Sequence, residues 1–137
     1  MLASLSYTQS AVWESEDALW RQAQRVAPTR PDPWIHGAQA VVDALGLGRD
    51  PERLAVAEGF LDRAAALGPH QSVTEQAWTR DSVDALRAVI RMRQGRLVEA
   101  AILMASGGPN SSRGRLCAHY RSVCALVWLP VSECLHC

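Results

Sequence analysis

The chain has 137 residues, the length of one small domain, and its formal net charge is zero with only 20% charged residues. This balance argues against a basic nucleic-acid-binding face and against a polyacidic tail. No run approaches the roughly 20 apolar residues that span a bilayer, and we expect no signal peptide at the N-terminus. Segments rich in Val, Ile and Thr are missing, so we expect an all-α fold.

Two helices are predicted first along the chain. Ser15 is a suitable N-cap, with acidic residues following it in the first turn, and this helix ends before Pro28. Asp32 and Pro33 repeat the start signal, with a capping carboxylate and a proline that needs no N–H bond at the first helical position. The second helix then runs to the LGLG segment at 45–48.

The next two helices also have clear start signals. Asp50 precedes a proline and an apolar stripe, which predicts a helix over 51–67. Ser72 and Glu75 have the spacing of a capping box, so a further helix begins near residue 73. It either continues to residue 93 or pauses near Asp81.

The last predicted helix follows a tight turn at Gly95 and covers 97–104. A GGPNSS cluster of helix breakers comes next. We therefore divide the chain into a lead segment (1–12), a helical domain (13–106) and a tail (107–137) that contains all four cysteines.

A large apolar residue, an alanine and a proline occur twice at the same offsets, 41 residues apart. The two copies are Trp20, Ala23 and Pro28, and Leu61, Ala64 and Pro69. Trp34 follows the first copy at six residues, and Ala57 precedes the second at four. Small residues let paired helices approach closely, large ones fill the space between units, and proline ends a helix where the chain reverses. A period of this length indicates stacked units.

This pattern resembles the tetratricopeptide (TPR) repeat, whose unit has about 34 residues. The extra residues would lie in the LGLGRDPE turn. A third unit follows from Asp81, with Gly95 at the turn and Ala100 in the second helix, although it lacks an aromatic residue in its first helix. The resemblance implies antiparallel helix hairpins in a right-handed superhelix of two to three units, acting as a protein-binding scaffold.

TPR arrays bind a partner peptide or helix along the face made by their first helices. The positions that the resemblance places there are Ile35, Gln39, Asp43, Val89, Met92 and Arg93. The alternative is that these residues only pack or cap the array, with Ile35 and Val89 in the core. The chain has no Lys, which argues against the TPR type that clamps a C-terminal carboxylate. Arg91 and Arg93 either bind acidic residues of a partner or form a solvated face.

A second resemblance covers only eight residues, WESEDALW at 13–20. This segment is similar to the junction between the last membrane helix and the C-terminal TPRs of membrane O-mannosyltransferase-like (GT-C type) proteins. It implies an auxiliary segment of a membrane glycosyltransferase system that positions protein substrates on the periplasmic or lumenal face. Without that origin we expect a cytoplasmic protein.

The cysteine tail leaves several alternatives open. The pair Cys134 and Cys137 has a spacing used in zinc sites, but Cys117 and Cys124 do not form the second close pair that structural zinc sites usually have. A small zinc-binding protein, disulfides in an exported tail, or an unstructured extension are the alternatives. We expect no cofactor.

No catalytic motif is present, so we expect a protein that is not an enzyme. His36 and His70 have no motif around them. We assign the carboxylates of the predicted helices to helix starts and solvent-facing turns. These carboxylates are Glu52, Glu58, Asp62 and Glu75. Tryptophans are assigned to the core, namely Trp13, Trp20, Trp34 and Trp78. An apolar surface near 97–104 or 122–129 predicts self-association.

Overall fold

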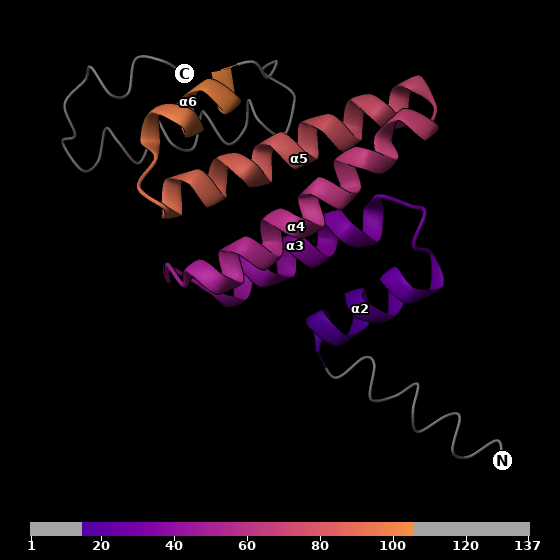
Figure 1. Cartoon of the computed structure of the whole chain (residues 1–137), viewed down its shortest axis with the longest axis horizontal. Helices are drawn as coiled ribbons and strands as arrows, with labels where there is room; N and C mark the ends of the chain where they lie inside the picture. Colours follow the sequence, from indigo (N-terminus) through magenta and orange to yellow (C-terminus); the bar gives the residue numbers. More distant parts are fainter. Residues whose placement is uncertain (1–14, 106–137) are drawn as a thin grey trace, which may run out of the picture.

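The structure, a computed structural model, describes residues 15–105 and is all-helical over that range. Figure 1 shows its helices following one another along the chain. They are α2 (Glu16–Val26), α3 (Asp32–Ala44), α4 (Pro51–Leu67), the short 3-10 helix η1 (Gly68–His70), α5 (Val73–Arg93) and α6 (Leu97–Ala105). The predicted all-α class is confirmed for this part of the chain. The lead segment 1–12 and the tail 107–137 lie outside it.

Three of the predicted helix starts have the expected caps. The Ser15 hydroxyl accepts a hydrogen bond from the Ala18 N–H at 3.1 Å. The Asp50 carboxylate accepts from two first-turn N–H groups of α4. Ser72 and Glu75 form the complete capping box at the start of α5. These bonds satisfy amide donors that have no partner inside a helix, which is why the boundaries could be predicted.

The predicted cap at Asp32 is wrong. The N-cap is Pro31, which makes no side-chain capping bond, and Asp32 is the first residue of α3. Pro31 already has helical backbone angles, so the helix starts one residue early and Asp32 falls in its first turn. There its carboxylate accepts a hydrogen bond from Arg30 at 2.9 Å.

Consecutive helices pack against each other: α2 on α3, α3 on α4, α4 on α5 and α5 on α6. In addition, α3 contacts α5, which brings two helices together that are separated by one complete helix. In Figure 1, α3, α4 and α5 form the middle of the molecule, α2 lies along one side of it and α6 along the other. The core therefore lies between α3, α4 and α5.

The main core cluster is built from the stripes that face each other on these three helices. Its buried residues are Ile35, Ala38, Val42, Leu54, Ala57, Leu61, Ala64, Val83, Leu86 and Ile90. The middle signature residues Ala57, Leu61 and Ala64 have no exposed surface, as a close helix contact requires. A second cluster joins Ala88 of α5 to Ala100 and Met104 of α6.

The first copy of the repeat is less buried than the second. Trp20 and Ala23 are only partly buried. The prolines that follow the two helices, Pro28 and Pro69, are exposed. The difference follows from position, because α2 packs mainly against α3 whereas α4 packs against both α3 and α5.

The second half of the described chain also follows the predicted boundaries. Helix α5 is continuous through Asp81, so the longer of the two alternatives holds. Gly95 has φ +78°, a conformation that glycine adopts without strain, and it makes the turn between α5 and α6. One assignment is wrong: Trp78 is 44% exposed rather than core. It lies in the first half of α5, where it lines a hollow together with Ile35, His36 and Gln39 of α3.

Candidate functional site

Three of the six predicted partner-binding residues line one hollow, of about 430 Å³, between α3 and α5. They are Ile35, Gln39 and Val89, joined there by His36 and Trp78 among others. Ile35 is only 4% exposed and belongs to the core cluster, so it forms the floor of the hollow and offers a partner little surface. The His36 ring is stacked on Trp20 of α2, with centroids 4.5 Å apart.

The other three predicted residues are occupied by contacts within the chain. Asp43 accepts a hydrogen bond from Gln39 at 2.8 Å. Met92 packs against the core cluster shared by α5 and α6. Arg93 donates to the backbone carbonyls of Gly46 and Gly48, and so ties the end of α5 to the turn between α3 and α4.

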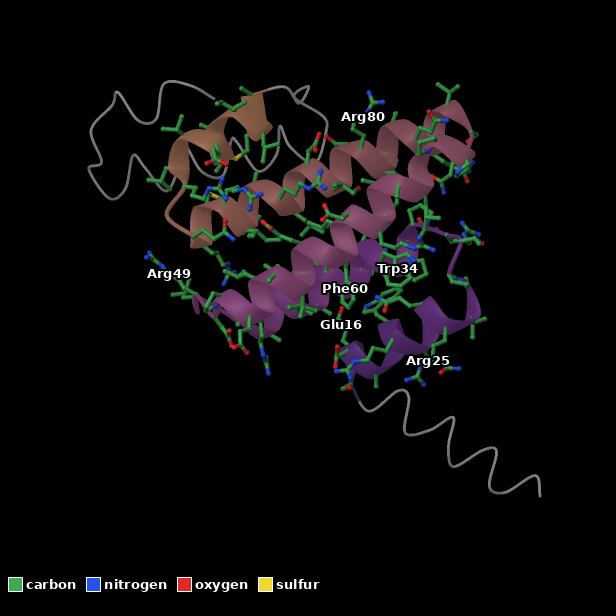
Figure 2. The ribbon with its side chains drawn as sticks, viewed as in Figure 1. Glu16, Arg25, Trp34, Arg49, Phe60 and Arg80 are labelled. Carbon is green, nitrogen blue, oxygen red and sulfur yellow. The ribbon has the colours of Figure 1, made fainter. Side chains whose placement is uncertain are left out.

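A larger hollow, of about 630 Å³, lies between α2, α3 and α4. We call it the α2–α4 groove. Its apolar lining includes Trp34 and Val41 of α3 and Val56 and Phe60 of α4. Figure 2 shows Trp34 and Phe60 in the space between α2 and the α3–α4 pair. Val56 is 50% exposed, so apolar surface is accessible in the groove.

Trp34 is held in a defined orientation in the groove. Its indole N–H donates to the Pro28 carbonyl at 3.2 Å, which fixes the ring to the turn between α2 and α3. The ring lies 5.9 Å from Phe60 at an interplanar angle of 60°, within the range of favourable aromatic pairs. The Arg63 guanidinium lies 6.0 Å from the indole centroid, at the limit of a cation–π contact. An aromatic wall with a fixed orientation suits recognition better than a mobile one.

One buried side chain joins α2 to α3. The Gln24 side chain is buried, and its amide donates to the Pro33 carbonyl at 3.2 Å. It lies over Gly37, where a Cβ atom would stand 2.4 Å from the Gln24 amide nitrogen. An alanine at position 37 would therefore move the end of the Gln24 side chain, which also lines the groove.

The charged lining of the groove is basic, although the whole chain is neutral. Three arginines and one aspartate contribute to it: Arg21, Arg25, Arg53 and Asp17. Asp17 and Arg21 pair along α2, and this hydrogen-bonded pairing raises the pKa of Arg21 above its usual value. Arg25 and Arg53 form no ion pair with any residue in the range 15–105. Two of the arginines that line the groove thus have no carboxylate partner within the described residues.

Away from the groove, charged side chains pair across helices. Arg91 bonds Glu58 of α4 and lies 3.5 Å from Glu99 of α6. Asp62 accepts from Arg87 at 2.6 Å. Asp62 faces solvent, with its side chain 72% exposed, whereas Glu58 is only 30% exposed, and both pairs join α4 to α5. Arg91 is used inside the chain and is not a free anion-binding group.

Other proposed features fall outside the site. Among residues 15–105 there is no group of three potential metal ligands, and the cysteine tail is outside this range. No helix in the described part is long and apolar enough to cross a bilayer. Comparison of the chain with protein-family models, curated proteins and solved structures found no match.

The α2–α4 groove was not predicted from the sequence. One signal was present: Val56 and Phe60 lie four residues apart on α4, outside the inward stripe that contains Leu54, Ala57 and Leu61. Helix α4 is therefore apolar on a second face, which indicates a second contact surface. The basic rim had no such signal, because it combines arginines of α2 and α4 that are far apart in the sequence.

Proposed function

We propose that this protein is an interaction scaffold that holds a helical segment of a partner protein in the α2–α4 groove. The observation that carries the proposal is an accessible apolar groove with two oriented aromatic rings, bordered by guanidinium groups. Helix-in-groove recognition uses an apolar floor that receives side chains three to four residues apart, and aromatic and arginine residues dominate the energy of such interfaces.

The scaffold is a TPR-like array in this proposal. Support comes from the packing of α3 on α4 and α5 on α6, together with the contact between α3 and α5, the two first helices of adjacent units. Further support comes from the alanines of the repeat, since Ala57, Ala64 and Ala100 are fully buried where helices meet. Such an array presents a rigid surface whose shape is set by stacking of neighbouring units.

The α3–α5 hollow is the alternative surface on the same scaffold. It is smaller, and its floor residue Ile35 is almost fully buried. The α2–α4 groove offers more accessible apolar surface through Val56 and also has unpaired charge. It is therefore the site that we assign to the partner.

The test is selection of binders from a displayed library of helical peptides, followed by affinity measurement with the full chain. Val56→Glu puts a charge in the groove and should weaken binding by more than about tenfold, equivalent to about 1.4 kcal/mol. Val73→Glu is the matched control, because Val73 is 83% exposed at the start of α5 and does not line the groove. It should leave the affinity unchanged.

Two results would contradict the proposal. If no helical peptide binds, the scaffold function fails. If Ser82→Glu in the α3–α5 hollow abolishes binding and Val56→Glu does not, the protein is a scaffold but the partner lies on the other face.

A further inference from the structure

We infer that the α2–α4 groove selects an amphipathic helix that carries acidic residues beside its apolar stripe. This inference rests on the proposed function and adds the chemistry of the partner. It follows from how charge and apolar surface are combined in the groove, and the predicted partner-binding positions on α3 and α5 play no part in it.

Basic residues outnumber acidic ones in the groove lining. The groove lining has three arginines and one aspartate, and that aspartate is already paired with Arg21. Arg25 near the end of α2 and Arg53 near the start of α4 reach the groove from different helices. Arg63, beside Trp34, also lacks an ion pair within the described residues. Guanidinium groups left without a carboxylate beside an apolar floor are complementary to carboxylates on a ligand.

The apolar floor distinguishes the partner from other anions. Trp34, Val56 and Phe60 contribute side chains that need apolar groups opposite them. A nucleic acid would require a longer track of basic residues to follow its phosphates, whereas here only a few guanidinium groups border the apolar surface. A helix with apolar residues at three- and four-residue spacing and Glu or Asp on either side satisfies both parts of the groove.

The experiment compares two synthetic peptides by fluorescence anisotropy with the full chain. Both have the same Leu and Phe stripe at helical spacing, and they differ only in the flanking positions, which are Glu in one and Lys in the other. The Glu peptide should bind at least about tenfold more tightly at low salt, as expected for two favourable ion pairs in place of repulsion. The difference should shrink as salt is added.

Variants then assign the preference to the groove. The double variant Arg25→Glu with Arg53→Glu should reverse the preference toward the Lys peptide. The neutral pair Arg25→Gln with Arg53→Gln should reduce it, because Arg63 remains beside Trp34. Arg80→Glu is the matched control, because Arg80 is also exposed and without an ion pair in the described part, and Figure 2 shows it on α5, away from Trp34 and Phe60. Circular dichroism checks that each variant keeps its helices.

The possible results separate the two proposals. Equal binding of both peptides overturns the inference, and so does a preference that the Arg25 and Arg53 substitutions leave unchanged. In either case, sensitivity to Val56→Glu would still support the scaffold. Failure of every helical peptide to bind overturns both. A single-stranded oligonucleotide that displaces the Glu peptide at equal concentration overturns the choice of an acidic helix.

Discussion

Two glycines in helix interiors should gain different amounts of stability from the same substitution. Gly59 on α4 has nothing within 4 Å of the position of an added Cβ, whereas at Gly37 on α3 that atom would meet the Gln24 amide at 2.4 Å. Replacing glycine by alanine inside a helix stabilises it by about 0.5–1 kcal/mol, since glycine loses more backbone freedom on folding. Gly59→Ala should therefore stabilise the protein by about that amount.

At Gly37 the same gain is opposed by the displacement of Gln24. The amide must leave its place, and it then loses the hydrogen bond to the Pro33 carbonyl, worth about 0.5–1.5 kcal/mol. Only the flexible end of Gln24 has to move, so the gain and the loss nearly cancel. We expect Gly37→Ala to change the free energy of unfolding by less than about 0.5 kcal/mol, below the gain at Gly59.

Urea denaturation followed by circular dichroism measures both free energies of unfolding. A double-mutant cycle isolates the contact: in a Gln24→Ala background the collision is absent, and Gly37→Ala should become stabilising. If Gly37→Ala stabilises the wild-type protein as much as Gly59→Ala does, or if the cycle shows no coupling, then α2 does not pack on α3 through this contact.

Three further substitutions are each measured as a change in the free energy of unfolding. Leu61→Ala removes a fully buried side chain and should cost about 2–5 kcal/mol, whereas Leu47→Ala, in the exposed turn before α4, should stay within about 0.5 kcal/mol. Arg91→Ala should cost about 1–2 kcal/mol, because it breaks links from α5 to both α4 and α6, and Arg87→Ala should cost less than about 1 kcal/mol, because its partner Asp62 is largely exposed. Ser72→Ala removes a helix cap and should cost about 1 kcal/mol at neutral pH. Hydrogen bonds from Ser72 lower the pKa of Glu75 below its ordinary 4.5. Their contribution to stability is therefore present above that pH and is lost as the pH falls through the lowered pKa. The difference in stability between Ser72→Ala and wild type should shrink in acid.

The helices were predictable because their ends are coded locally. Ser15, Asp50 and Ser72 each sit directly before a helix that starts where the cap requires, and Gly95 occupies a turn that needs positive φ. The start of α3 could be placed at either of two residues from the sequence. The N-cap is Pro31 rather than Asp32, because Pro31 has helical backbone angles. A start signal therefore fixes the helix to within about a residue, but not the capping bond.

The exposed and paired residues were less predictable, because they depend on which helices meet. The period of α5 marks Trp78 as apolar but does not say that no helix covers it. Arg91 could not be distinguished from a solvated arginine without knowing that Glu58 and Glu99 come from neighbouring helices. The predicted apolar surface of α6 is present, with Val98 and Ile102 exposed on one face, and self-association through it stays a prediction.

The α2–α4 groove shows most clearly how packing decides a binding surface. Trp34 was identified from its place in the repeat, but it becomes a groove residue only because α2 stands against α3 through Gln24 and Gly37 and leaves the α4 side chains Val56 and Phe60 accessible. The Gln24 side chain, which joins α2 to α3, therefore also forms part of the groove lining. Gly37→Ala should weaken peptide binding, because it moves Gln24 within the groove lining, whereas Gly59→Ala should change stability alone. Equal peptide affinity in the two variants would show that the groove is formed without the α2–α3 contact.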